Sequence, residues 1–426
     1  MTTTEPFRLG SVALPVYLPS LLFATGEGAI IPIIPVAAVH LGASLALAGF
    51  IAALITVGQL IGDLPSGWIV ARIGERNAML WSAVAALLGL VVALLAPNPF
   101  VLAIGVLIVG IATAAFALAR QAFMTSFVPR AYRARALSLL GGMFRAGYFL
   151  GPFIAAAVIG LAGSTQAAFW IDAIACFAAG GVLLALPDPS AVLAARRQAP
   201  THASAARSGA TRSQVGAGGA LAPAERAGLF RTIRRHRGVL ARMGTNAALI
   251  GGLRSSRQVI LPLLGVSLHM PESSIALVIG IAGGIDFALF FSSGKIMDRF
   301  GRLWSALPSM IGLAIGHLAL LATAGLHSAL IWFIAIAMFL SVANGIGSGI
   351  LMTFGADLAP RHDPAPFLGA YRFTGDAGNA AAPLVIAGVT AVSTVAVAAG
   401  VIGVVGLVGA GLIARWVPRY IPRTAS

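Results

Sequence analysis

Three charged residues interrupt two long apolar segments of this sequence. Glu27 lies near the middle of segment 12–38, and Arg254 and Arg257 lie within segment 239–268. A charged side chain inside a membrane is costly, and such residues usually line a pathway or a binding site. A carboxyl group there can hold a proton among apolar neighbours and release it beside an arginine. These residues therefore predict a site that binds a proton or a charged substrate.

Prolines at equivalent places relate the two segments. When Pro32 is aligned with Pro262, Glu27 matches Arg257, and Arg254 lies about one helical turn earlier. We therefore expect an ion pair between acid and base that breaks and re-forms during function. The alternative is a fixed ion pair that only holds the structure together.

A second set of charged residues lies nearer the ends of its segments. It comprises Arg120, Arg145, Arg372 and Asp376. Arg372 and Asp376 are four residues apart, so they share one helix face and can pair. An alignment of the two halves places Arg145 at the position of Asp376, which predicts opposite charges facing each other. We expect an inner gate or proton relay here, with Arg120 also a candidate for substrate binding; the alternative is a static network.

Further polar residues add candidates to the central site. Asp286 matches Gln59 in the other half and is a second candidate proton carrier, whereas Asp172 is expected to start a helix. The remaining polar contacts expected in a cavity are few: Tyr17, Asn246, Gln258, Asn344 and Tyr371. Because Phe, Leu and Met surround them, the cavity favours amphiphilic or drug-like cargo over a sugar, which needs several converging polar groups.

The composition requires a membrane around these residues. The chain has 426 residues, of which 58% are hydrophobic and only 10% charged. A soluble domain of this size needs a more charged surface, so lipid must cover most of the outside. The net charge of +15 does not indicate nucleic-acid binding, because the basic residues lie in short loops and one linker without a nucleic-acid motif.

Long apolar segments occur throughout the chain, and each is close to the roughly 20 residues that cross a bilayer. They are 12–38, 45–70, 77–96, 101–128, 136–162, 166–186, 239–268, 274–297, 303–325, 329–358, 366–390 and 394–415. The sequence therefore predicts an all-α integral membrane protein with twelve transmembrane helices.

The basic residues predict the orientation of these helices. With the N-terminus in the cytoplasm, every loop rich in arginine falls on the cytoplasmic side and the outer loops contain no Lys or Arg. This is the asymmetry that sets membrane topology, so we expect both termini to be cytoplasmic. Three parts follow: a six-helix half at 1–187, a partly disordered cytoplasmic linker at 188–237, rich in Ala, Gly, Ser and Arg, and a second six-helix half at 238–426.

Two short motifs occur once in each half, which indicates a duplication. The loop after the eighth segment contains Gly294, Asp298, Arg299, Gly301 and Arg302, and the loop after the second contains Gly67, Arg72, Gly74 and Arg76. In the loop after the second segment, Ala71 stands at the position of Asp298 and Glu75 at the position of Arg302. In the fifth segment, Gly147, Gly151 and Pro152 form a further motif, which 378–383 echoes.

These motifs resemble those of the major facilitator superfamily over nearly the whole chain. The resemblance implies two pseudo-symmetric six-helix halves with a substrate path between them. It also implies that Asp298 caps a helix of the other half and pairs with loop arginines. Ala71 cannot do this in the first half, and our hypothesis is that Asp63 partly substitutes for it. The motif at Gly147 is similar to that of family members that export compounds by exchange. The alternative for all these glycines and arginines is packing and topology alone.

The expected function is transport driven by an ion gradient. We find no nucleotide-binding loop, metal-ligand cluster or nucleophile–base pair, so we expect neither an enzyme nor a cofactor. The leading hypothesis is proton-coupled efflux of small amphiphilic or drug-like compounds. The alternatives are a transporter of a polar or anionic metabolite (sugar, organic acid or amino acid) and a membrane receptor without transport. The expected partners are the lipid bilayer, protons and a small-molecule substrate, with no nucleic acid, for a monomer in a bacterial plasma membrane.

Overall fold

The computed structural model describes residues 16–128, 130–185, 234–360 and 364–421. These residues form fourteen helices and no strand. The first half contains α1 (Leu18–Ile30), α2 (Ile34–His40), α3 (Leu45–Ile73), α4 (Glu75–Leu94), α5 (Pro99–Phe127), α6 (Arg130–Ala162) and α7 (Gln166–Ala185). The second half contains α10 (Arg237–Ser267), α11 (Glu272–Phe300), α12 (Leu303–Thr323), α13 (Ala329–Ile346), α14 (Ile350–Leu358), α15 (Pro364–Val392) and α16 (Val395–Tyr420).

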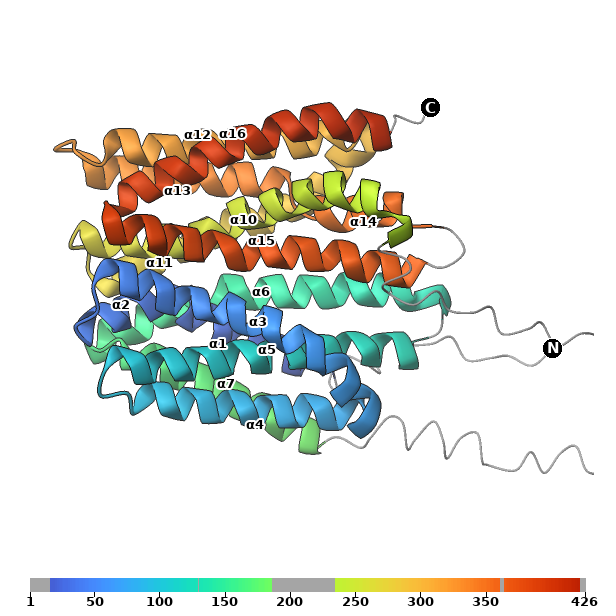
Figure 1. The fold of residues 1–426 in the computed structure, drawn as a ribbon. Coiled ribbons are helices and arrows are strands. Elements are labelled where there is room, and N and C mark those ends of the chain that lie inside the picture. The colour runs from blue at the N-terminus through green and yellow to red at the C-terminus, as the bar shows by residue number, and fades with distance from the viewer. Residues whose placement is uncertain (1–15, 129, 186–233, 361–363, 422–426) are drawn as a thin grey trace, which may run out of the picture.

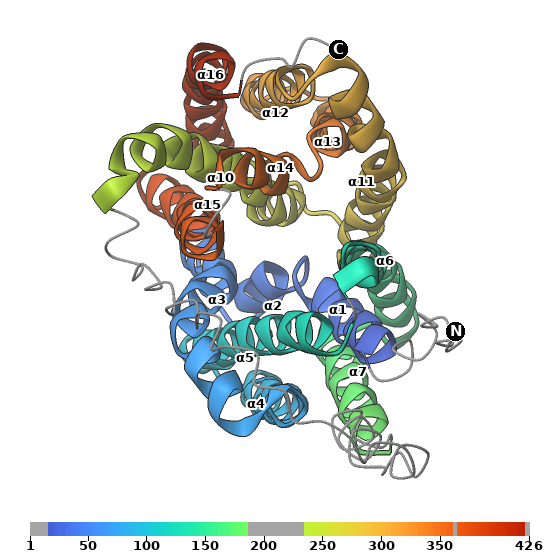
Figure 2. The same ribbon diagram turned by 90° about the vertical axis from the view of Figure 1, so that its right-hand side faces the viewer.

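The helices run alongside one another as a bundle of two halves (Figure 1). Seen along the bundle in Figure 2, the first half, in blue to green, lies beside the second half, in yellow to red. The halves meet where α3 packs against α15 and where α6 packs against α11. Between these seams, α10 also contacts α2 and α3 of the first half.

The same pattern of neighbours occurs in both halves, as a duplication would produce. In the first half α1 packs against α6 and α7, and α3 packs against α5. In the second half α10 packs against α15 and α16, and α11 packs against α13. The predicted boundaries of the parts stay a prediction, because most of the linker 188–237 lies outside the described residues.

Two of the predicted segments are broken helices. Helices α1 and α2 meet at an angle of 41°. Pro32 lies at this bend, and a proline removes a helical hydrogen bond and clashes with the preceding turn. The second break, between α13 and α14, contains Gly347, Ser348 and Gly349, and Gly349 has a φ of 80°, which favours glycine. At the second break the carbonyl oxygens of Ile346 and Ser348 accept hydrogen bonds from side chains of neighbouring helices.

The number of membrane spans is supported only in part. Nine segments of the described chain are long and apolar enough to cross a membrane, and the bent α1–α2 pair makes a tenth. The remaining two of the twelve predicted segments correspond to helices α10, with 31 residues, and α15, with 29. Both are long enough, but charged side chains along them lower their hydropathy. Twelve spans and cytoplasmic termini therefore stay predictions.

The glycines of the fifth-segment motif lie in a close helix crossing. A Cβ atom on Gly147 would overlap atoms of α1 at Leu21, Ala24 and Thr25. Gly151 meets the backbone of α1 one turn further along. Small residues of this kind let membrane helices approach until their backbones touch. The motif therefore fixes how closely α6 packs against α1.

Replacing Gly151 with alanine is expected to destabilise the fold. The added Cβ would meet the backbone of Thr25, Gly28 and Ala29, which has no flexible side chain to move aside. Overpacking of this kind costs about 1–3 kcal/mol, measured as a lower unfolding temperature of the purified protein. Gly142 lies in the same helix, with nothing within 4 Å of an added Cβ, so Gly142→Ala is the control. Equal unfolding temperatures for both variants would contradict the close crossing.

Candidate functional site

Glu27 is buried among helices of the first half. Its Oε1 accepts a hydrogen bond from the Gln59 Nε2 on α3 at 2.9 Å. Tyr148 of α6 lies beside the carboxyl group, and the charge of Arg120 on α5 acts on it. Only 1% of Glu27 is exposed. In the described part of the chain, the second oxygen, Oε2, has no hydrogen bond of ordinary geometry. The carboxyl group is therefore bonded to the neutral amide of Gln59 and lies beside the Tyr148 side chain, without a contact ion pair to Arg120.

Two glycines on either side of this acid allow α1 to approach its neighbours. Gly26 faces Asp172 of α7, and Gly28 faces the backbone of Tyr148 on α6. A Cβ at either position would overlap these atoms, so a larger residue would push the helices apart. The two glycines thus let α1 lie close to α6 and α7, so that Glu27 is buried between these helices.

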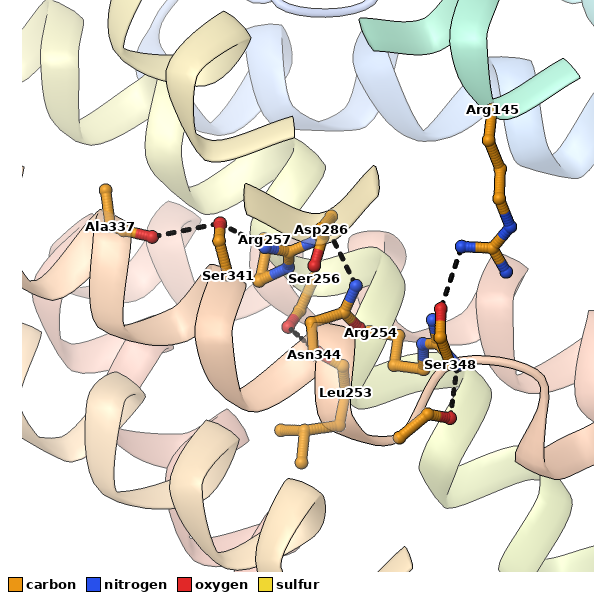
Figure 3. A network of polar contacts seen from close by, with 11 residues as sticks. Arg145, Leu253, Arg254, Ser256, Arg257, Asp286, Ala337, Ser341, Asn344 and Ser348 are labelled. Carbon is orange, nitrogen blue, oxygen red and sulfur yellow. Dashed lines mark hydrogen bonds and ion pairs between the residues drawn. The ribbon is translucent and has the colours of Figure 1, made fainter. Parts of the chain in front are cut away.

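The predicted ion pair between Glu27 and Arg257 does not form. Arg257 instead pairs with Asp286 on α11, with 2.5 Å between NH2 and Oδ2. It also donates from NH1 to the Ser341 hydroxyl at 2.9 Å. The Asn344 amide donates to the same Asp286 oxygen at 2.9 Å, which completes the cluster in Figure 3. The prediction was wrong because an internal alignment gives a residue its depth but not the direction in which its side chain points.

The two clusters nevertheless occupy equivalent places in the two halves. The alignment of the halves matches Glu27 with Arg257 and Gln59 with Asp286. In each half, the residue on the first helix bonds to its neighbour on the second: Glu27 of α1 to Gln59 of α3, and Arg257 of α10 to Asp286 of α11. An acid with a neutral amide stands in one half, and a base with an acid stands in the other.

Arg145 and Arg254 reach the break between α13 and α14. Arg145 of α6 donates from NH1 to the Ser348 hydroxyl at 2.8 Å and lies over the Phe290 ring, 4.1 Å from its centroid. Arg254 of α10 donates from NH1 to the Gly347 carbonyl oxygen at 3.2 Å. The predicted opposition of Arg145 to Asp376 is wrong, because Arg145 turns toward α11 and the broken helix instead.

Arg120 belongs to the Glu27 cluster. Its guanidinium carbon lies 4.2 Å from the centroid of the Phe144 ring. Among the described residues, its buried NH1 has no hydrogen-bond partner. Its charge acts on Glu27 without a contact ion pair. A change of charge at Glu27 would therefore be felt directly by Arg120.

The remaining charges of the second set join the two halves. Arg372 and Asp376 pair on α15, with 3.5 Å between Nε and Oδ2. Arg372 also donates to Gln121 Oε1 on α5 at 3.2 Å. The carboxyl group of Asp63 on α3 lies within electrostatic range of both. This set thus connects α15 with α3 and α5, which is the position an inner gate requires; its role as a gate stays a prediction.

Both loop motifs form the same tight turn between helices. Gly74 has a φ of 82° and Gly301 a φ of 93°, in the left-handed region that glycine adopts without strain. Arg76 donates from NH2 to the Leu183 carbonyl oxygen at the end of α7, at 2.6 Å. Arg302 pairs with Asp357 of α14, with 3.0 Å between Nε and Oδ2. The motif arginines therefore tie each turn to another helix of its own half.

Other members of the motifs make fewer contacts of this kind. The Arg72 guanidinium lies over the Trp68 ring at 5.2 Å, and that of Arg299 over the Phe300 ring at 5.4 Å. A Cβ on Gly294 would meet nothing within 4 Å. The side chain of Asp298 lies outside the described part of the chain, so the predicted helix-capping role of this acid stays a prediction.

Sequence reasoning missed several partners of the site and misjudged one acid. Asp172 does not start a helix: it lies one and a half turns into α7, is 2% exposed, and accepts a contact from the Cys176 thiol at 3.5 Å. The four-residue spacing of these two could have suggested the contact. No local sequence pattern indicates that Gln59 and Tyr148 lie beside Glu27 or that Ser348 binds Arg145, because polar residues of these types occur throughout membrane helices.

A small pocket lies between the halves near the bend between α1 and α2. Its lining comes from Ile31, Ile34, Ala52, Ile55, Thr56, Ser255, Gln258, Val259 and Pro383. The residues that the structure describes contain no group of three or more side chains suited to hold a metal ion. The charged side chains that the structure brings together in the interior include the Glu27 cluster, the Arg257 cluster and the two arginines at the helix break.

Comparisons with known proteins concern both sequence and fold. The sequence profile of the Major Facilitator Superfamily matches residues 16–383. A stretch of 138 residues is 25% identical to "Probable inositol transporter 2" of Arabidopsis thaliana, and it covers 32% of this chain and 24% of that protein. The chain thus spans about a quarter of the length of this relative.

Solved structures share the fold at low sequence identity. The crystal structure of a D-xylose-proton symporter superposes with a TM-score of 0.73 at 15% identity, covering 98% of this chain and 99% of the other. A POT family transporter in complex with 5-aminolevulinic acid gives a TM-score of 0.73 at 12% identity, covering 97% of each chain. At these identities the likeness concerns the arrangement of the helices.

Proposed function

The chain belongs to the Major Facilitator Superfamily, and we propose that it is a proton-coupled secondary transporter that exports small amphiphilic compounds by alternating access. In alternating access, two packed halves rock about a central site so that it opens to one side of the membrane at a time. The seams between α3 and α15 and between α6 and α11 are the surfaces on which this movement would occur.

The observation that carries the proton coupling is the environment of Glu27. Its hydrogen-bonded partner is the neutral amide of Gln59, and its second oxygen accepts no hydrogen bond of ordinary geometry from the described residues. Taking up a proton there breaks no contact ion pair. Protonation of Asp286, in contrast, would leave Arg257 without its counter-ion, and a buried charge without a partner is costly. Glu27 is therefore the better of the two predicted proton carriers.

A proton on Glu27 would change the forces between helices. In its ionised form the carboxylate attracts Arg120 of α5, and in its neutral form it does not. Because α1 also packs against α6 through its glycines, this change acts on the helix that lies next to α11 of the other half. A ligand or proton can shift a conformational equilibrium only through such a difference between states.

The direction of transport rests on a separate feature. The motif that contains Gly147, Gly151 and Pro152 is similar to that of family members that export by exchange, and its glycines form the crossing of α6 with α1. Uptake together with protons would be a different coupling, in which cargo and proton cross the membrane in the same direction. A second candidate cargo, a polar or anionic metabolite, is favoured by the excess of arginines around the α13–α14 break.

Flux in proteoliposomes tests this function directly. The purified protein in vesicles is expected to move cargoes from a mixed panel faster when a pH gradient is imposed than without one. A protonophore should remove that difference, because the proton gradient is then lost. Binding of a cargo without any flux would instead identify a receptor. Equal flux with and without the gradient, for every cargo transported, would rule out proton coupling.

A further inference from the structure

Two arginines from opposite halves meet at the break between α13 and α14. Arg145 of α6 donates to the Ser348 hydroxyl at 2.8 Å, and Arg254 of α10 donates to the Gly347 carbonyl oxygen at 3.2 Å. Figure 3 shows both side chains ending at this short segment. Because Gly347 and Ser348 are consecutive, the two guanidinium groups are near enough for their charges to act on each other.

Neither arginine has an acidic partner. Within the described residues, Arg145 and Arg254 form hydrogen bonds but no ion pair. The acid whose charge acts on both is Asp286. That acid already pairs with Arg257 at 2.5 Å. In the part of the chain that the structure describes, three arginines therefore share one carboxylate, and two positive charges lack a counter-ion.

This imbalance is unfavourable in the interior of a bundle. A hydroxyl and a carbonyl oxygen orient a guanidinium group but do not neutralise it. Like charges repel more strongly where water is scarce, because the effective dielectric constant is lower. A carboxylate or phosphate would neutralise the pair and form charge-assisted hydrogen bonds with both forks. The arrangement is thus complementary to an anion.

The main chain around the break supports the same conclusion. The carbonyl oxygens of Ile346 and Ser348 already accept hydrogen bonds from the hydroxyls of Ser305, at 2.6 Å, and Ser293, at 2.7 Å. The break is therefore held by neutral serines as well as by arginine. Helix α14 begins immediately after Gly349, and no side chain caps its first turn. The start of a helix favours negative charge.

We propose that Arg145 and Arg254 bind an anionic group, a carboxylate or phosphate, at the α13–α14 break, and that the cargo is an amphiphilic organic anion. The cargo assignment rests on the proposed transport function, whereas the anion site does not. Arg145 comes from the first half and Arg254 from the second. An anion between them would therefore link the halves, and its binding would depend on how the halves are rotated.

Anion binding to the purified protein tests the site without any transport. We expect inorganic phosphate to raise the unfolding temperature more than chloride at equal ionic strength. In Arg145→Gln and Arg254→Gln this difference should be lost, with binding about ten- to a hundredfold weaker, as the loss of one charge-assisted bond implies. Arg242 is the control: it lies on α10, is exposed, and binds the Tyr420 hydroxyl at 2.6 Å. Arg242→Gln should respond to phosphate as the unmodified protein does.

The controls separate binding from general effects. Phosphate stabilises many proteins without binding, but that effect is the same in all variants. An identical phosphate response in the unmodified protein and in a variant lacking both arginines would overturn the site. A response to anionic phospholipid but not to phosphate would show that a lipid headgroup occupies it, and would overturn the cargo assignment.

The cargo assignment is tested by exchange across vesicles. An aryl carboxylate, its neutral amide and its trimethylammonium analogue are compared as competitors of transport in the unmodified protein and in Arg254→Gln. The carboxylate should compete best, and its advantage over the amide should disappear in the variant. A better competition by the cation would overturn the assignment. Absence of all flux beside a clear phosphate response would refute the transport function and leave the anion site standing.

Discussion

Replacing Glu27 with glutamine is expected to abolish transport against a gradient while exchange of cargo continues. Glutamine keeps the size of the side chain and can still bond to Gln59, but it cannot take up or release a proton. Accumulation driven by a pH gradient should therefore fall to the level of empty vesicles. Exchange of labelled for unlabelled cargo at equal pH moves only the cargo-loaded protein and no net proton, so it needs no uptake or release of a proton at Glu27. The measurement is the ratio of these two rates.

A matched variant distinguishes this loss from a loss of folding. Glu75 lies at the start of α4, outside the bundle interior, and Glu75→Gln makes the same chemical change. We expect it to keep pH-driven accumulation, and both variants should unfold near the temperature of the unmodified protein. Unchanged coupling in Glu27→Gln would remove Glu27 as the proton carrier. In that case Asp172, buried beside the same helix, would be the next acid to test.

Breaking the pair of Arg257 and Asp286 is expected to cause the largest loss of stability. Both side chains are mostly buried, with 12% and 17% exposed. Asp286→Ala leaves a buried guanidinium group without its counter-ion, which typically costs about 3–5 kcal/mol. The Asn344 amide would lose its acceptor as well. Unfolding of the purified protein by heat or denaturant measures the loss.

A double variant separates the structural role of this pair from a functional one. Changing Arg257 to Gln and Asp286 to Asn together removes both charges and keeps hydrogen-bonding groups in place. The double variant should recover most of the stability lost by the single ones, because neither member of the pair is left as a charge without its partner. Flux that returns together with stability identifies a structural pair. Flux that stays absent in a stable double variant assigns the charges to transport. Additive losses would show that the two residues do not interact.

Much of the helical architecture follows from the sequence. The predicted segments 45–70, 166–186 and 303–325 agree closely with α3, α7 and α12. Hydropathy and length determine such segments locally, since an apolar run surrounded by lipid must satisfy its own backbone. The turns at Gly74 and Gly301 follow in the same way, because their backbone conformation favours glycine.

The candidate site was predictable only as a set of residues. Of the charges that the sequence singled out, Glu27 is buried and Arg257 mostly buried, yet Glu27 bonds to Gln59 rather than to Arg257, and Arg145 reaches Ser348 rather than Asp376. Membrane helices contain many residues such as glutamine and serine, so nothing local marks the ones that become partners.

The sequence by itself determined the helical segments, the repeated turns and the position of each charged residue along its helix. The tertiary structure decided which charges meet. Which charges meet depends on how each helix is rotated and how closely it crosses its neighbours. Gly28, for example, lets α1 contact α6. The break at Gly349 places Ser348 within hydrogen-bonding distance of Arg145. Rotation and crossing come from packing over the whole bundle, and no stretch of sequence encodes them alone.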